Sequence, residues 1–229
     1  MQGAIFDLDG TLADTAGDLL AAANAALAPE GLPLLDPSGD RQVAGRGGRA
    51  MIRRSLEKAA HDPDAPEARA LADRLYPVLL TAYEARIAEE TRLYDGLEAC
   101  LDTLEARGWR LGICTNKPER LARILMEKLG ILHRFGALLG ADTLAVRKPD
   151  PEHLLETCRR IGADPKRSVL IGDTITDLTT ARRAHMPCIL TSFGFAAEPL
   201  GDLAPDAILH QYAELATMLE TLNRPTTHA

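Results

Sequence analysis

The segment Ile5-Phe6-Asp7-Leu8-Asp9-Gly10-Thr11 is the most informative part of the chain. Apolar residues lead into two carboxylates, followed by glycine and threonine, which predicts a short buried strand that ends in a turn. Side chains at positions i and i+2 of an extended segment share a face, so Asp7 and Asp9 can converge on one small site. Two carboxylates that close repel each other unless a cation lies between them or one is protonated. The segment therefore suggests a divalent metal site and a nucleophile at the end of the first strand.

Three later segments place polar residues after short apolar runs or in a stiff loop. Leu111-Gly112-Ile113-Cys114 leads into Thr115-Asn116-Lys117-Pro118, and Ser168-Val169-Leu170-Ile171 leads into a second acidic turn at residues 172–177. Between them, Val146-Arg147-Lys148-Pro149-Asp150-Pro151 carries a lysine. The order of acid pair, hydroxyl, lysine and acid pair resembles the haloacid dehalogenase superfamily of phosphohydrolases over the whole chain. Within it, the chain is most similar to the phosphoglycolate phosphatase family.

Composition favours a helix-rich α/β protein and disfavours several function classes. The 229 residues are 46% hydrophobic but only 4% aromatic, so a core must consist mostly of aliphatic side chains. With 26 basic and 33 acidic residues the net charge is −7, and no basic stripe indicates a nucleic-acid partner. No apolar run reaches the roughly 18 residues of a membrane span. The chain shows no signal peptide and its four cysteines form no CxxC pair, so the cytoplasm is the expected location.

Alternating strand and helix patterns predict a Rossmann-like parallel-sheet core. The expected strands are Gly3–Phe6, Arg110–Cys114, Ala137–Gly140, Ser168–Ile171 and Cys188–Leu190. The expected helices are Gly96–Arg107, Glu119–Leu129 and Pro151–Ile161, each followed by a glycine suited to a C-cap, and His185 is expected to serve as such a cap elsewhere. Ligands bind beyond the carboxyl ends of parallel strands, so Asp7, Thr115 and Asp173 should meet at one edge of the sheet.

The stretch between the first two core strands is too long for a simple crossover. Residues 14–92 show helical patterns at Gly17–Leu27, Arg49–Ala60 and Pro66–Ala88, which predicts an all-helical cap domain inserted into a core of residues 1–13 and 93–229. A cap at this point can close over the first acidic turn and exclude water. The resemblance implies the same, since one subfamily carries a helical cap at this position. The last residues, Arg224–Ala229, are expected to form a loose tail.

The first acidic turn is expected to carry the covalent chemistry. The resemblance implies that Asp7 is both nucleophile and metal ligand, since a carboxylate can attack a phosphoryl group and form an aspartyl-phosphate. The residues alone leave open that Asp7 only binds metal. Asp9 is expected to act as general acid and then as general base, because the leaving alkoxide needs a proton and the hydrolytic water must lose one. Its backbone carbonyl is expected to reach the metal; the alternative is that Asp9 only stabilises the turn.

The second acidic turn is expected to complete a Mg²⁺ site through Asp173. Mg²⁺ prefers oxygen ligands and keeps several waters, a requirement that two carboxylates, the Asp9 carbonyl and a phosphate oxygen would satisfy. Asp177 lies one helical turn beyond Asp173 and is expected either to support the metal's waters or to hold Lys148. A plainer interpretation is a negative charge placed favourably at a helix N-terminus.

Thr115, Asn116 and Lys148 are expected to act on the phosphate. The hydroxyl and amide can donate hydrogen bonds to phosphate oxygens, and the N-terminal amides of the following helix are expected to point the same way. Lys148 would stabilise charge on the transferring phosphoryl group and on Asp7. For Thr115 and Asn116, ordinary helix capping is the alternative.

Within the predicted cap, Gly45-Arg46-Gly47-Gly48-Arg49 precedes a helix. Glycines in that position expose backbone amides to an anion, and Arg46 or Arg49 could bind a substrate carboxylate through a bidentate fork. Gly45, Arg46 and Gly47 are therefore candidate substrate-binding residues. The alternative is a glycine-rich hinge with surface arginines.

The motifs and the resemblance together favour a Mg²⁺-dependent phosphatase of a small phosphorylated metabolite, with 2-phosphoglycolate expected first. Other sugar or metabolite phosphates, such as N-acetylmuramic acid 6-phosphate, or pyrophosphate, are alternative substrates. A receiver-like signalling protein also gathers acids, a hydroxyl and a lysine, but the size of the chain and its helical insertion disfavour it. A non-catalytic phosphate-binding protein is disfavoured because every expected catalytic residue is present. The expected assembly is a monomer or homodimer.

Overall fold

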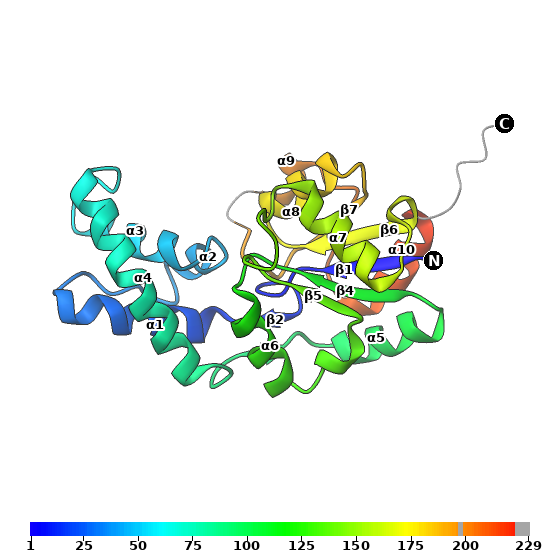
Figure 1. The fold of residues 1–229 in the computed structure, drawn as a ribbon, viewed down its shortest axis with the longest axis horizontal. Helices are drawn as coiled ribbons and strands as arrows, with labels where there is room; N and C mark the ends of the chain where they lie inside the picture. The colour runs from blue at the N-terminus through cyan, green and yellow to red at the C-terminus, as the bar shows by residue number, and fades with distance from the viewer. Residues whose placement is uncertain (197–198, 223–229) are drawn as a thin grey trace. The chain divides into compact units, whose positions relative to one another are not determined.

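The computed structural model describes residues 1–196 and 199–222 and divides the chain into two units. The core unit comprises Met1–Ala13 and Leu93–Ala229, and the helical unit comprises Asp14–Arg92. Figure 1 labels the helices and strands of both. The expected tail, Arg224–Ala229, lies outside the described residues.

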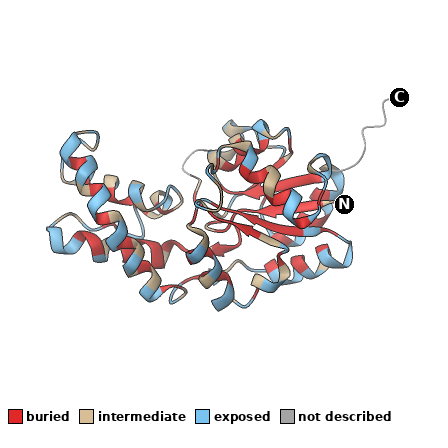
Figure 2. Ribbon diagram, in the orientation of Figure 1, coloured by how far each residue is buried: buried red, intermediate tan, exposed pale blue. Residues whose placement is uncertain are grey.

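The core unit is built on a six-stranded parallel sheet in the order β5-β4-β1-β6-β7-β8. Its strands are β1 (Gly3–Phe6), β4 (Arg110–Cys114), β5 (Ala137–Leu139), β6 (Ser168–Gly172), β7 (Cys188–Thr191) and β8 (Ala207–Leu209). Every residue of β1 is buried, as expected for a parallel strand that is covered on both faces. Figure 2 shows the buried residues concentrated in this sheet. Strand β8 was not predicted, because three apolar residues are too few to give a periodic signal.

Helices cover the sheet on both faces, with α7 and α8 on one side and α5 and α6 on the other (Figure 1). The helices of this unit are α5 (Leu97–Ala106), α6 (Glu119–Lys128), α7 (Pro151–Ile161), α8 (Ile175–Arg183), α9 (Leu200–Leu203) and α10 (Leu215–Leu222), with 3-10 turns η2 (Leu132–Arg134), η3 (Pro165–Arg167) and η4 (Tyr212–Glu214). Leu154 of α7 and Leu178 of α8 pack in one buried cluster with Ile5 and Leu170 of the sheet. Burial of an aliphatic side chain of this size contributes about 1.5–3 kcal/mol, so these stripes attach both helices to the sheet.

Two helix ends use the backbone conformation that the sequence indicates. Gly162 caps α7 with φ 67°, and His185 follows α8 with φ 52°. Both values lie in the left-handed region, which glycine enters freely and histidine tolerates better than most residues. The predicted C-caps at Gly162 and His185 are therefore confirmed.

The helical unit consists of α1 (Ala16–Leu27), η1 (Ala28–Glu30), α2 (Arg41–Ala44), α3 (Gly48–Lys58) and α4 (Pro66–Arg86). Helices α1 and α3 both pack against α4. Asp18 of α1 accepts hydrogen bonds from the backbone N–H groups of Glu90 and Thr91, at 2.9 and 3.0 Å, and from the Thr91 hydroxyl at 2.6 Å. Asp18 therefore ties the beginning of this unit to its end.

Two short strands mark where the chain leaves and re-enters the core unit. They are β2 (Ala13–Asp14) and β3 (Arg92–Leu93), which pair in a separate two-stranded sheet. Neither was predicted, because two residues give no pattern. Within the described part of the chain, no helix combines the length and apolar character needed to cross a bilayer.

Candidate active site

Strand register brings the predicted motifs to one edge of the sheet. Phe6 pairs with Ile113 of β4 on one side and with Ile171 of β6 on the other. The chain continues beyond these aligned positions to Asp7, to Thr115 and to Asp173 respectively. The Asp7 N–H extends the ladder by donating to the Ile171 carbonyl at 2.8 Å. Three motifs that are far apart in the sequence thus begin side by side.

Three carboxylates gather at this edge. Oxygens of Asp7, Asp173 and Asp177 all lie within 4.8 Å of one another, and Asp173 and Asp177 are fully buried. Burial raises the pKa of Asp7 to about 6, although the nearby ammonium of Lys148 opposes that shift. Burial, followed by the charge of Asp177, raises the pKa of Asp173 well above its usual value. If all three carboxylates were ionised, their negative charge would exceed what the single ammonium of Lys148 offsets.

Lys148 lies among these acids. Its Nζ is 2.6 Å from Asp177 Oδ1 and 3.0 Å from Asp7 Oδ2, and the side chain is almost completely buried. Burial alone would lower the pKa of Lys148, but the charges of Asp177 and Asp7 outweigh it and raise that pKa above its usual value. Lys148 is therefore a fixed cation that touches the proposed nucleophile.

Asp177 uses its second oxygen to organise the start of α8. Its Oδ2 accepts hydrogen bonds from the Thr174 hydroxyl at 2.8 Å and from the Thr174 backbone N–H at 3.1 Å. The two expectations for Asp177, a support for Lys148 and a charge at a helix N-terminus, therefore describe its two oxygens.

Thr115 and Asn116 make contacts within the loops around the site. The Thr115 hydroxyl accepts a hydrogen bond from the Lys117 N–H at 3.3 Å, and the Asn116 side-chain amide donates to the Lys148 carbonyl at 3.0 Å. The Glu119 N–H, the first amide of α6, donates to Asp142 at 2.7 Å. The expectation that this helix offers its N-terminal amides to phosphate is therefore wrong for that first amide, because a carboxylate from another loop already caps it.

Asp9 has a partner that sequence reasoning missed. Lys117 Nζ lies 3.0 Å from Asp9 Oδ1 and 3.3 Å from Oδ2. The signal was present, since Lys117 stands between two polar residues and a proline in the turn that follows β4. Its target could not be read, because 108 residues separate it from Asp9.

The donor set suits a divalent cation that prefers oxygen. Asp173 Oδ2 accepts a hydrogen bond from the Phe195 N–H at 2.7 Å, whereas its buried Oδ1 has no hydrogen-bond partner among the described residues. An unpaired buried carboxylate oxygen beside two further carboxylates is unfavourable unless a cation neutralises it. The acidic cluster contains Asp177 and lacks the Asp9 side chain. The expectation that the Asp9 backbone carbonyl reaches a metal stays a prediction.

The predicted glycine loop belongs to the helical unit. Gly47 precedes α3 with φ 86°, and the Arg46 side chain is exposed and has no hydrogen-bond or ion-pair partner among the described residues. Arg49 is engaged inside its own unit, at 3.0 Å from Asp73 and 4.2 Å above the centre of the Tyr76 ring. Arg46 and Arg49, which the sequence leaves equivalent, therefore differ in the structure.

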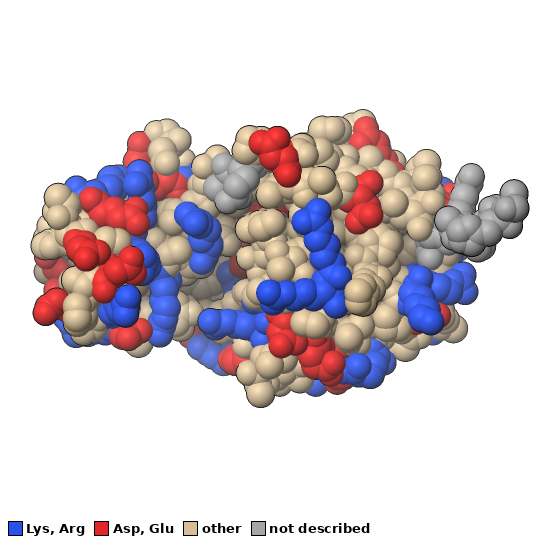
Figure 3. All heavy atoms as spheres, turned by 90° about the horizontal axis from the view of Figure 1, so that it is seen from above, with Lys and Arg blue, Asp and Glu red and all other residues tan. Residues whose placement is uncertain are grey.

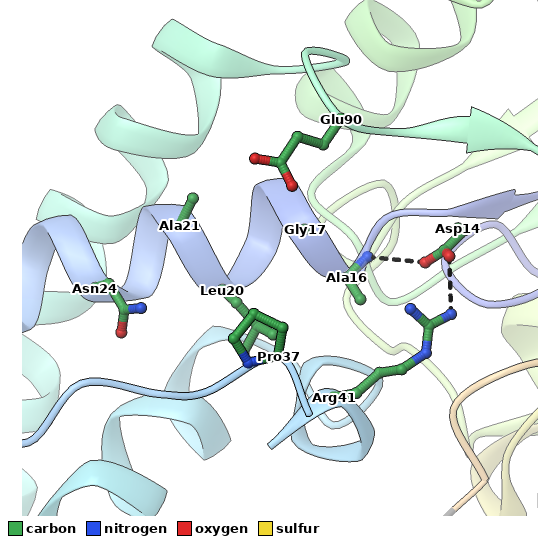
Figure 4. A pocket seen from close by; sticks show the side chains of 9 residues that line it. All are labelled: Asp14, Ala16, Gly17, Leu20, Ala21, Asn24, Pro37, Arg41 and Glu90. Atoms are coloured by element: carbon green, nitrogen blue, oxygen red, sulfur yellow. Dashed lines mark hydrogen bonds and ion pairs between the residues drawn. The ribbon is translucent and has the colours of Figure 1, made fainter. Parts of the chain in front are cut away.

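The helical unit also contains a cavity of about 390 Å³ (Figure 4). Its lining residues are Asp14, Ala16, Gly17, Leu20, Ala21, Asn24, Pro37, Arg41 and Glu90. Asp14 and Arg41 form an ion pair at 2.9 Å within it, and the Asn24 amide is bonded to the backbone of Leu35. None of the residues predicted for the site lines this cavity.

Figure 3 shows the charged side chains on one face of the molecule. Basic and acidic side chains are interspersed there over the helical unit, with no stripe of one sign.

Comparison with known proteins identifies a family whose model spans all four motifs. The family model described as haloacid dehalogenase-like hydrolase matches residues 4–191. The chain belongs to this family. It is 41% identical over 216 residues to the phosphoglycolate phosphatase of Agrobacterium fabrum, covering 94% of this chain and 91% of that one. It is 38% identical over 226 residues to the phosphoglycolate phosphatase of Caulobacter vibrioides, covering 97% and 94%.

Solved structures of this family share the fold. A predicted phosphoglycolate phosphatase from Haemophilus somnus superposes with a TM-score of 0.84 at 25% identity, covering 95% of this chain and 97% of that one. CbbY from Rhodobacter sphaeroides, in complex with phosphate, gives a TM-score of 0.76 at 25% identity over 96% and 99% of the two chains. The predicted superfamily and α/β fold class are confirmed. The named relatives also confirm the predicted enzyme class, a phosphatase of this family.

Proposed function

We propose that the chain is a Mg²⁺-dependent phosphatase that hydrolyses a small phosphate monoester through an aspartyl-phosphate on Asp7. The observation that carries the proposal is the group of Asp7, Asp173 and Asp177, whose oxygens lie within 4.8 Å of one another, together with a buried lysine that contacts the first and the last of them. Relatives named phosphoglycolate phosphatase favour 2-phosphoglycolate as the substrate.

Asp7 would attack first. One of its oxygens forms a bond to phosphorus as the bond from phosphorus to the leaving-group oxygen breaks, and Asp9 gives its proton to that oxygen. In the second step Asp9 takes a proton from water, whose oxygen attacks phosphorus and displaces Asp7. Inorganic phosphate leaves, Asp7 is again a carboxylate and Asp9 is again an acid. Lys148, 3.0 Å from Asp7, would stabilise the negative charge that builds on the phosphoryl group, while Thr115 and Asn116 would donate to phosphate oxygens.

Asp7, Asp173 and the backbone carbonyl of Asp9 would hold Mg²⁺. A bound divalent ion would offset the repulsion between an attacking carboxylate and an anionic ester. The unpartnered Oδ1 of Asp173 supports its role as a ligand. The 2.6 Å contact between Asp177 and Lys148 favours Asp177 as a support for the lysine.

The helical unit would act as the cap, and its glycine loop would recognise the leaving group. Gly45 and Gly47 would let the backbone approach an anion, and Arg46 would bind a substrate carboxylate. The engagement of Arg49 by Asp73 and Tyr76 supports the choice of Arg46.

A substrate panel with metal removal and add-back tests this function. The protein is stripped with EDTA and assayed with and without Mg²⁺ on 2-phosphoglycolate, N-acetylmuramic acid 6-phosphate, pyrophosphate and p-nitrophenyl phosphate. Turnover that requires Mg²⁺ and is fastest on 2-phosphoglycolate is expected. Faster turnover of another ester would reassign the substrate, and no turnover of any ester would contradict the catalytic proposal.

The nucleophile is tested by Asp7→Asn. The amide keeps the size of the side chain but cannot attack phosphorus, so kcat should fall by roughly a hundredfold or more. Acid-quenched wild type incubated with substrate should yield an Asp7 peptide that carries one phosphoryl group. A variant that retains most of its activity, or a phosphoryl group found on another residue, would exclude Asp7 as the nucleophile.

A further inference from the structure

Lys117 forms a buried ion pair with the side chain of Asp9. We propose that Lys117 is a positioning residue, which holds the Asp9 carboxylate in the orientation needed to protonate the leaving group. The inference rests on the proposed function, since it assumes that Asp9 is the general acid and base. It assigns a role to a buried cation that has no part in the proposed reaction.

The geometry of the pair restricts Asp9. One ammonium lies within hydrogen-bond distance of both carboxylate oxygens, at 3.0 and 3.3 Å, so rotation of the carboxylate would break a contact. The Lys117 side chain is 4% exposed and that of Asp9 is 18% exposed. The lysine is thus enclosed by protein while part of the acid remains open to a ligand. This is the arrangement of a support behind a reacting group.

Lys117 is itself held in place by its backbone. Its N–H donates to the Thr115 hydroxyl at 3.3 Å, and its carbonyl accepts from the Ala141 N–H at 2.9 Å. Gly140 lies so close that a Cβ there would be 2.7 Å from the Lys117 carbonyl. Because this turn is fixed against the loop after β5, Asp9 aligns to Lys117 and not the reverse.

The two buried lysines near the site have separate partners. Lys148 contacts Asp7 and Asp177, and Lys117 contacts Asp9. Loss of Lys117 should therefore impair both proton transfers of Asp9, and only the first of them, to the leaving oxygen, differs between esters. That step matters for an alkoxide, which is a poor leaving group, and much less for p-nitrophenolate, which leaves without a proton.

The experiment compares leaving groups in a double-mutant cycle. Lys117→Met, Asp9→Asn and the double variant are assayed on 2-phosphoglycolate, on ethyl phosphate and on p-nitrophenyl phosphate. Lys117→Met should lower kcat/KM, which reports only the steps up to departure of the leaving group, about 10- to 100-fold on both alkyl esters and less than about threefold on p-nitrophenyl phosphate. In the Asp9→Asn background, Lys117→Met should cause no further loss on the alkyl esters, because the residue acts through Asp9. Exposed Lys166→Met is the matched control and should behave as wild type.

The other outcomes would contradict either the positioning role of Lys117 or the acid role of Asp9. Equal losses of kcat/KM on all three esters would overturn the inference, since they indicate contact with the phosphoryl group or general damage, which the melting temperature separates. A loss on 2-phosphoglycolate alone would also overturn it and indicate contact with the substrate carboxylate. If Asp9→Asn itself shows no preference for the activated ester, the acid role in the proposed function fails. If only Lys117→Met lacks that preference, the positioning role fails and the proposed function stands.

Discussion

His153 shows how burial controls ionisation at the scale of a single residue. It lies on α7 with no solvent exposure. Burial lowers its pKa to about 4, and the ammonium of Lys148 shifts it in the same direction. Since an unfolded chain restores the ordinary value of about 6.5, the folded state binds fewer protons than the unfolded state between these two values. The contribution of neutral His153 to the free energy of unfolding should therefore be fully present above pH 6.5 and be lost as the pH falls toward 4.

The prediction for His153 is a change in the pH dependence of stability. His153→Leu removes the titrating group, so its free energy of unfolding should fall less steeply than that of wild type between pH 6.5 and 4. The difference in free energy of unfolding between wild type and His153→Leu should change by up to roughly 2–3 kcal/mol across this window. Urea unfolding at several pH values measures it, with exposed His61→Leu as the control that keeps the wild-type slope. Parallel curves for wild type and His153→Leu would contradict the assignment.

At the scale of elements, the loop after β7 packs against Asp173, the acid that follows β6. The Phe195 N–H donates to Asp173 at 2.7 Å, and a Cβ on Gly194 would lie 2.6 Å from the Gly10 carbonyl and too close to Asp173 itself. Gly10, in turn, has φ 79° and contacts the same carboxylate. Two glycines from separate loops thus leave just enough room for one acid. The position of Asp173 depends on close backbone approach from both sides.

Gly194→Ala should therefore weaken Mg²⁺ binding. The added methyl group must push Asp173 or the loop away, and changes around metal ligands typically cost about 10- to 100-fold in affinity. Calorimetric Mg²⁺ titration measures the effect. Gly201→Ala is the matched control, because no heavy atom of the described residues, apart from its chain neighbours and its own helix backbone, lies within 4 Å of the new Cβ. An unchanged affinity in Gly194→Ala would mean that the loop yields without moving the carboxylate.

At the scale of the whole molecule, phosphate chemistry and substrate choice are assigned to different units. In the proposed function, the residues of the core unit would act on groups that every phosphate ester shares, namely the phosphoryl group and the leaving oxygen. Discrimination between esters must come from other surfaces, and the proposed cap is the source that we favour. Arg46 offers an exposed guanidinium without a partner among the described residues, whereas Arg49 is held by Asp73 and Tyr76.

Arg46→Ala should consequently raise KM for 2-phosphoglycolate and spare p-nitrophenyl phosphate. Loss of an arginine–carboxylate contact costs about 1.5–3 kcal/mol, or roughly 10- to 150-fold in kcat/KM. Arg49→Ala is the paired variant; it should lower the stability of the helical unit slightly and keep the preference between the two esters. Equal losses on both esters for Arg46→Ala would indicate that this residue shapes the loop, and no loss would leave it without a role in recognition.

Local chemistry made much of this protein predictable. Helix α7 has the bounds expected from its apolar spacing, because Pro151 starts it and Gly162 ends it. The strands that precede Asp7, Thr115 and Asp173 were predicted from uninterrupted apolar runs, since a parallel strand buried on both faces requires them. Strand β5 ends one residue earlier than expected, because the Gly140 N–H donates to the Thr143 hydroxyl at 2.8 Å instead of to a neighbouring strand.

The sequence by itself thus determined which short segments are strands and helices and which polar residues follow them, because those properties depend on neighbours along the chain. Only the tertiary structure decided which side chains are partners. The contacts of Lys117 with Asp9 and of Phe195 with Asp173 join residues 108 and 22 positions apart. Such pairs arise from strand order, register and the close packing of loops, and no local pattern records them. Long-range packing also distinguishes Arg46 from Arg49. The two arginines look alike in the sequence, but only Arg49 contacts Asp73 and Tyr76.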